Sequence, residues 1–192
     1  MSRCLIKHTT KNLSEYHIDF VWENAQDLEH VACLHRRTNY DFELLSVDRD
    51  ESNHFPYRSL SFRTKRKVLG FIPVSTFGFR KIIDKYLIYQ IEYIPLLHTT
   101  TVLKSTLIEF PADPSKTLML DHVLVNLPSF LRPIAWLIPA NLDRHTRLQC
   151  EEDEGFRCRR LELDSRGIKL PISLFGKSML DEAIAAFEKN EG

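Results

Sequence analysis

The sequence has few of the features that mark disulfide-stapled or nucleic-acid-binding proteins. Only six of its 192 residues are glycine and four are cysteine, and no two cysteines have C-x-x-C spacing. Small secreted domains that depend on disulfides are much richer in cysteine. Lys plus Arg and Asp plus Glu each number 26, so no net charge attracts a phosphate backbone. We therefore expect reduced thiols and no nucleic-acid partner.

Long hydrophobic runs are also missing. Residues 85–97 and 127–140 form the longest ones, and Lys, Glu, Arg or Pro interrupts each run before about 20 residues, the length that crosses a bilayer. The first dozen residues lack the apolar stretch and the small-residue cleavage site of a secretory signal. The sequence therefore predicts no transmembrane segment and a cytoplasmic protein.

The chain shows no repeat, linker or low-complexity tract, which predicts a single domain over residues 1–192 with a C-terminal tail over about 168–192. Residues 20–35 have the apolar spacing of a helix. Residues 128–160 predict a second helix with a break near Pro139. Between them lie runs rich in β-branched and aromatic residues, which predict a meander of antiparallel strands; these include residues 42–47, 57–64, 85–94, 101–110 and 117–125.

This order of elements indicates an α+β fold in which one curved antiparallel sheet wraps around a long C-terminal helix. Such an arrangement leaves a cavity between sheet and helix, and the aromatic content of the strands predicts that the cavity is apolar. A basic cluster is expected to coat an exposed strand or loop, or alternatively to dock an acidic redox protein; it consists of Arg63, Lys65, Arg66 and Lys67.

The most informative segment runs from Glu23 to His35 and reads E-x3-D-x2-H-x4-H. It resembles the mononuclear-iron motif in the catalytic domain of Rieske non-heme iron oxygenases, which belong to the helix-grip (SRPBCC) superfamily with START and Bet v 1-like proteins. The resemblance covers the motif strictly and the order of elements loosely over nearly the whole chain. It implies a stand-alone helix-grip domain in which His30 and His35 bind Fe(II).

The same segment lacks a complete motif for the Rieske cluster itself. Cys33 and His35 give its first half, C-x-H, but no C-x-x-H follows in the sequence. We therefore expect no Rieske cluster in this chain. In the family, the counterpart of Asp27 carries electrons from that cluster to the iron, a role that Asp27 cannot take over unaltered here. Asp27 is the catalytic candidate.

The spacing of these residues also constrains the geometry of the helix that carries them. Two histidines five residues apart point about 140° apart on a regular helix. They meet at one metal ion only if the helix ends or tightens around residues 32–34. Asp27 precedes His30 by three residues, which on a helix puts its carboxylate on the same face, where it can orient the imidazole.

The two histidines need a carboxylate as a third ligand. Two imidazoles and one carboxylate on one side of an octahedron form the usual non-heme Fe(II) site, which leaves open positions for dioxygen and substrate. The resemblance places that carboxylate on the C-terminal helix, more than about a hundred residues after the histidines. Asp153 lies 118 residues after His35 (153 − 35) and shares a helical face with Leu142, Thr146 and Gln149. The alternatives are Glu152, Glu154 and Asp143.

Three functions follow from these observations. The first is a non-heme Fe(II) oxygenase acting on a hydrophobic, aromatic or polycyclic, small molecule, with electrons from a separate electron-donor protein or from the substrate. The second is a START-like carrier or sensor of a hydrophobic ligand, in which the motif is a relic and its histidines bond to Asp27 and Glu23. The third is a Zn(II) hydrolase or cyclase on the same triad.

Overall fold

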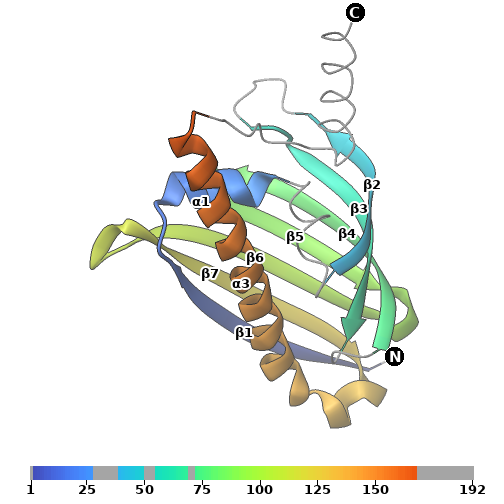
Figure 1. Ribbon diagram of the computed structural model, residues 1–192. Coiled ribbons are helices and arrows are strands. Elements are labelled where there is room, and N and C mark those ends of the chain that lie inside the picture. The colour runs from blue at the N-terminus through green and yellow to red at the C-terminus, as the bar shows by residue number, and fades with distance from the viewer. Residues whose placement is uncertain (1, 28–38, 50–54, 69–71, 168–192) are drawn as a thin grey trace, which may run out of the picture.

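The computed structural model describes residues 2–27, 39–49, 55–68 and 72–167, which form a strongly curved sheet around one long helix (Figure 1). The expected α+β helix-grip architecture is confirmed. The elements, in chain order, are β1 (Arg3–Ser14), α1 (Ile18–Gln26), β2 (Asn39–Asp48), β3 (Ser59–Val68), β4 (Ile72–Asp84), β5 (Leu87–Ile94), the 3-10 helix η2 (Pro95–Leu97), β6 (Thr99–Phe110), β7 (Asp113–Pro128), the 3-10 helix η3 (Ser129–Ile134) and α3 (Leu137–Ser165).

The seven strands that the described residues form are all antiparallel to their neighbours, in the order β1-β7-β6-β5-β4-β3-β2. Strands β2 to β7 form the expected meander, each pairing with the next. Strand β1 pairs with β7, so the chain between β1 and β2 must connect opposite edges of the sheet. Helix α1 lies in this connection and covers one end of the concave face, while α3 crosses the middle of that face (Figure 1).

The strands alternate between a face that contacts α3 and a face that contacts water. In β4, which was not among the predicted runs, Val74, Thr76 and Gly78 are buried while the residues between them are exposed. On the outer face, Arg63 pairs with Glu43 in the neighbouring strand at 2.5 Å. This alternation gives each strand one polar and one enclosed side.

Two apolar clusters flank the middle of the concave face. At one end, Val21 and Trp22 of α1 belong to a buried cluster with Leu60, and the Trp22 ring makes edge-to-face contacts with the rings of Phe55 and Tyr86. At the other end, the last residues of β7, from Val123 to Leu127, pack against η3 and the start of α3. Between the two clusters, a space remains between the inward-facing side chains of the sheet and α3.

The prediction of a continuous helix over residues 20–35 is wrong. Helix α1 ends at Gln26, and Asp27 has an extended backbone with φ −76° and ψ 105°. The Asp27 N–H donates to the Asn24 carbonyl oxygen, only three residues back, at 3.2 Å, which tightens the last turn in the manner of a 3-10 helix. Residues 28–38 lie outside the described residues, and so do His30, His35 and the expected bend near residues 32–34.

The expected helix break near Pro139 is also wrong. Helix α3 begins at Leu137, so Pro139 lies in its first turn. The backbone N–H groups of a first turn have no acceptor within the helix, and a proline there removes no hydrogen bond. The C-terminal tail, residues 168–192, lies outside the described residues. Among the helices that the structure describes, none is long and apolar enough to cross a membrane.

Candidate functional site

A cavity of about 220 Å³ lies between the concave face of the sheet and α3. Its apolar wall is built from inward-facing side chains of successive strands, which include Phe62, Ile88, Leu103, Met119 and Val123. Helix α3 closes the opposite side with Leu142, Thr146, Gln149 and Asp153. The expected inward-facing stripe of the C-terminal helix is therefore confirmed.

A second wall of the same cavity is polar and continuous across three strands. Arg66 of β3 pairs with Glu92 of β5 at 2.6 Å. The Gln90 amide donates to the same Glu92 oxygen at 2.7 Å and accepts from Arg80 Nε of β4 at 2.6 Å. Arg80 also donates to the backbone carbonyl oxygen of Ala25, at the end of α1, at 3.5 Å. The cavity therefore combines an apolar wall with a charged one.

The two arginines of this wall differ in their partners. Burial alone raises the pKa of Glu92, but the adjacent Arg66, with help from His145 and Gln90, holds it below its ordinary value of 4.5. Glu92 is therefore ionised at neutral pH and balances the charge of Arg66. The two acceptors that the described residues offer Arg80 are a side-chain amide and a backbone carbonyl, both neutral. Arg80 thus brings a positive charge to the cavity wall.

Asp121 of β7 is a second carboxyl group in the wall, in a different environment. It lies opposite Ser105 of β6 and Thr10 of β1 and accepts a hydrogen bond from each, the one from Thr10 at 3.5 Å. Burial raises its pKa above the ordinary value, although Ser105, Thr10 and His122 oppose the change. The cavity therefore holds two carboxyl groups whose surroundings move their pKa values in opposite directions.

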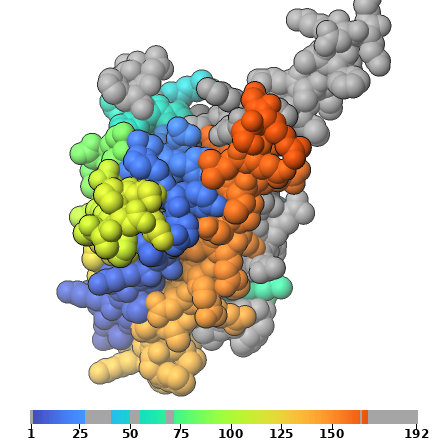
Figure 2. Space-filling view, turned by 60° about the vertical axis from the view of Figure 1, so that its left-hand side comes forward, coloured from blue at the N-terminus to red at the C-terminus, as the bar shows by residue number. Residues whose placement is uncertain are grey.

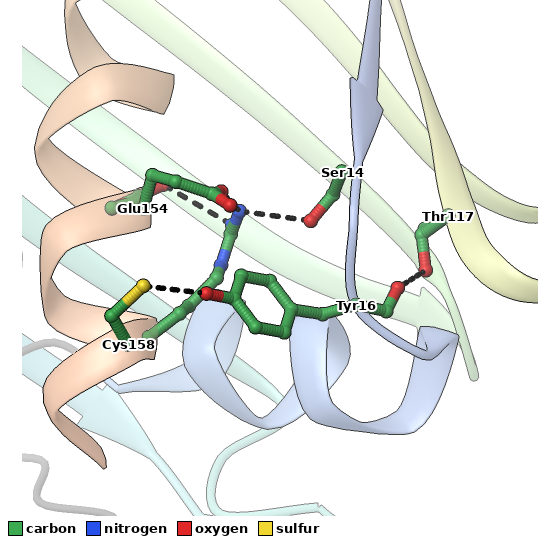
Figure 3. Close-up of polar contacts among 7 residues, drawn as sticks. Ser14, Tyr16, Thr117, Glu154 and Cys158 are labelled. Carbon is green, nitrogen blue, oxygen red and sulfur yellow. Dashed lines mark hydrogen bonds and ion pairs between the residues drawn. The ribbon is translucent and has the colours of Figure 1, made fainter. Parts of the chain in front are cut away.

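Polar contacts fix α3 over this cavity. The guanidinium of Arg157 donates to Ser14 Oγ at 3.2 Å and lies 3.4 Å from Asp153 Oδ2. The Tyr16 hydroxyl contacts Cys158 Sγ at 2.9 Å, while the Tyr16 carbonyl oxygen accepts from Thr117 Oγ1 at 2.7 Å (Figure 3). Hydrogen bonding to Cys158, followed by burial, raises the pKa of Tyr16 to about 12. The second half of the helix is thereby attached to the end of β1 and to Tyr16 just after it, and Tyr16 is in turn bonded to β7.

Of the four carboxylates considered as a third metal ligand, only Asp153 lines this cavity. Asp143 is exposed and contacts His8 at 2.7 Å instead, and Glu154 lies 3.6 Å from Arg157. Asp27 is buried directly after α1 but is not among the described residues that line the cavity.

The metal assignments themselves stay predictions, because His30 and His35 lie outside the described residues. Within the described residues, no three His, Cys, Asp or Glu side chains are grouped closely enough to hold a metal ion. The helical geometry that was to align Asp27 with His30 ends at Gln26. Arg157 is also a cation that already neighbours one oxygen of Asp153.

The polar wall of the cavity was not predicted from the sequence. Arg66 was expected on an exposed surface with Arg63 and Lys65, and that expectation is wrong for Arg66. The two-residue period of β3 could have indicated the inward position of Arg66. Leu60, Phe62 and Thr64 are buried, and Arg66 continues the same face of the strand. Arg80, Gln90, Glu92 and Asp121 are polar residues in largely apolar strands, and the sequence does not reveal which polar residues of a strand face a cavity.

Neither a scan of protein-family models nor a search of curated proteins found a match to this chain. Solved structures do match it. An aromatase/cyclase from Streptomyces sp. R1128, ZhuI, has a TM-score of 0.60 at 15% identity and covers 83% of this chain and 96% of its own. A START superfamily protein from Mycobacterium smegmatis has a TM-score of 0.59 at 10% identity and covers 81% of this chain and 97% of its own.

A dicamba monooxygenase bound to 3,6-dichlorosalicylic acid also matches, with a TM-score of 0.50 at 13% identity over 97% of this chain and 60% of the enzyme. At such identities a structural match shows the fold and leaves the activity open. The architecture and these matches agree: the chain has the helix-grip fold of START-like (SRPBCC) proteins.

Proposed function

We propose that the protein binds a compact hydrophobic small molecule that carries oxygen groups, in the cavity between the sheet and α3. The observation that carries this proposal is the pairing of an apolar wall with a polar one in a single, partly open cavity. Ligand sites are typically apolar surfaces with a few placed polar groups that orient the ligand. Here Phe62, Leu103 and Met119 offer the apolar surface, and Arg80 and Asp121 offer a cation and a carboxyl group.

The size of the cavity narrows the class of ligand. A protein cavity of about 150 Å³ holds benzene, so about 220 Å³ suits one or two rings better than a long acyl chain or a large polycycle. Arg80 suits a carboxylate or phenolate on that ring, because a charged hydrogen bond is stronger than a neutral one. The dicamba monooxygenase with this fold is bound to such a molecule, a ring with a carboxylate.

The test is a fluorescence titration of the full chain with 2-naphthoic acid, a two-ring carboxylate. We expect saturable binding of one molecule. Leu103→Trp fills the cavity and should abolish it, and Arg80→Leu should weaken it by about tenfold because a charged hydrogen bond is lost. Ile83→Trp, on an exposed part of β4, is the control and should bind like the wild type. Equal binding by the wild type and Leu103→Trp would overturn the proposal.

A non-heme iron oxygenase on the same fold is the second candidate, and the cavity position of Asp153 favours it. In this proposal His30, His35 and Asp153 hold Fe(II), a donor set of two nitrogens and one oxygen that suits this ion. Fe(II) held there would supply the activation of dioxygen, and the electrons would come from a separate donor protein or from the ligand itself. A Zn(II) hydrolase or cyclase would use the same three residues with a different metal ion.

Metal analysis after anaerobic loading separates these candidates from a metal-free binding protein. The oxygenase proposal predicts about one Fe(II) per chain in the wild type, with large losses in His30→Ala and His35→Ala and a smaller loss in Asp27→Asn, since losing a ligand costs more than losing its support. Asp143→Asn is the control. Retention of zinc in preference to iron would indicate the hydrolase or cyclase. A wild type that retains no metal would contradict both, while leaving binding of 2-naphthoic acid unaffected.

A further inference from the structure

The turn between β7 and α3 exposes large apolar side chains at one end of the molecule. It consists of η3 and the two residues that follow it, and it projects beyond the sheet in both views (Figures 1 and 2). Phe130 is 64% exposed, Ile134 41% and Trp136 74%. We call these three residues the η3 patch. Trp136 has the highest exposed fraction of any large hydrophobic side chain among the described residues.

This exposure is held in place by the other side of the turn. Leu131, Ala135 and Ile138 pack inward against Val123 and its neighbours on β7. The Ser129 N–H and hydroxyl both donate to the Ser2 carbonyl oxygen, at 3.2 and 2.5 Å. Side chains three apart lie above one another in a 3-10 helix, which groups Phe130 with Pro133. The turn is thus anchored on its inward side, while Phe130, Ile134 and Trp136 are exposed to solvent.

We propose that the η3 patch inserts into the interfacial region of a phospholipid bilayer. Tryptophan and phenylalanine combine a large apolar surface with a preference for this region, and tryptophan adds a hydrogen-bonding N–H at the level of the headgroups. The charge pattern fits a surface of phosphates. Arg132 is exposed within the turn, and no acidic residue occurs between Asp121 and Asp143 in the sequence.

A second copy of the chain fits this surface less well. A whole aromatic side chain covers about 150–250 Å², and these three side chains are only partly exposed. The patch therefore offers less than about 500 Å², below the approximately 800 Å² per partner of a stable protein interface. The inward side of the same turn packs against the cluster of Val123, Val125 and Leu127, of which Val123 lines the cavity.

The test measures binding of the full chain to phosphatidylcholine vesicles. The chain has two tryptophans, and Trp22 is 5% exposed, so a blue shift in emission and protection from iodide on adding vesicles report on Trp136. Trp136→Ser should lower the partition coefficient at least about tenfold, because most of the apolar area of the patch is lost. Ile83→Ser removes an apolar side chain of 52% exposure at the opposite end of the sheet and should bind like the wild type.

Three outcomes would overturn the proposal. The wild type does not partition onto vesicles; the wild type and Trp136→Ser partition equally; or sedimentation without vesicles shows a dimer that Trp136→Ser dissociates, which would assign the patch to a second copy. Because Trp136 is exposed, Trp136→Ser should keep the wild-type melting temperature, so a loss of binding cannot be attributed to unfolding. Binding of 2-naphthoic acid is measured separately and does not depend on any of these results.

Discussion

The ring of Phe62 lies directly on the backbone of Gly78, its register partner on the neighbouring strand. A Cβ atom added to Gly78 would lie 2.1 Å from Phe62 Cζ and 2.5 Å from both Cε atoms. The ring thus fills the space of the missing side chain and stacks on Phe42, with their centroids 5.3 Å apart. Gly78 keeps Phe62 flat on the sheet, and the room above that ring is part of the cavity.

Gly78→Ala should therefore push the Phe62 ring into the cavity. We expect the free energy of unfolding to fall by about 1–3 kcal/mol, the usual effect of overpacking, and binding of 2-naphthoic acid to weaken. Urea unfolding measures the first effect and the fluorescence titration the second. Phe62→Leu should cost less in the Gly78→Ala background than in the wild type, because the smaller side chain relieves the clash with the added methyl group.

The matched control for this prediction is Gly155→Ala. Gly155 lies in α3, and an added Cβ would meet nothing within 4 Å. Alanine is the better helix former, so this variant should be more stable than the wild type by up to about 1 kcal/mol. If the two glycine variants changed stability equally, the contact between Phe62 and Gly78 would not determine the effect.

The ion pair of Arg66 and Glu92 should be one of the costliest polar contacts to break. Glu92→Gln keeps a hydrogen-bonding side chain but leaves the largely buried Arg66 guanidinium without its opposite charge, which should cost about 3 kcal/mol of stability. Glu43→Gln breaks the exposed pair with Arg63 and should cost less than about 1 kcal/mol. Urea unfolding of both variants at pH 7 measures these losses of stability. Equal losses would contradict the buried position of Arg66.

The same pair predicts how stability depends on pH. The pKa of Glu92 in the folded protein lies below its ordinary value of 4.5, so the unfolded chain takes up a proton first as the pH falls. The stability contributed by ionised Glu92 is complete above pH 4.5 and is lost as the pH falls below it through the folded pKa. The stability difference between the wild type and Glu92→Gln should therefore shrink below pH 4.5. A difference that stays constant from pH 7 to pH 3 would argue against this.

The attachment of α3 predicts a contrast between two neighbouring arginines. Arg157 is buried and bonded to Ser14 and Asp153, whereas Arg159 is exposed. Arg157→Met should lower the free energy of unfolding by about 3 kcal/mol, since it removes the buried guanidinium that pairs with the Asp153 carboxylate and bonds to Ser14. Arg159→Met should change it by less than about 0.5 kcal/mol. Thermal or urea unfolding tests both, and a reversed order would mean that Arg157 does not fix the helix.

Much of the fold could be predicted because hydrophobic period and element order determine it. The alternating strands and the inward stripe of α3 through Leu142 and Asp153 follow from spacing alone. The end of α1 could not be predicted, because neither proline nor glycine marks it and the tightened turn at Asn24 and Asp27 is a local hydrogen-bonding choice. Strand β4 was missed because its apolar residues are diluted by threonine and glycine on the buried face.

The polar wall of the cavity could not be predicted for a different reason. A charged residue in a strand is more often solvated than enclosed, and only the register of β3, β4 and β5 brings Arg66, Arg80 and Glu92 together. These residues are between 12 and 26 positions apart in sequence (92 − 80 and 92 − 66). The sequence motif covers Glu23 to His35, whereas the residues of the cavity wall belong to no motif.

The most direct test of binding inside the cavity is a methionine-methyl NMR titration of the full chain with 2-naphthoic acid. Met119 lines the cavity, and its methyl resonance can be assigned with Met119→Leu. We predict a saturable upfield or downfield shift from the aromatic ring of the ligand, which is lost in Leu103→Trp. An unchanged Met119 resonance at a ligand concentration that saturates the fluorescence signal would contradict binding between the sheet and α3.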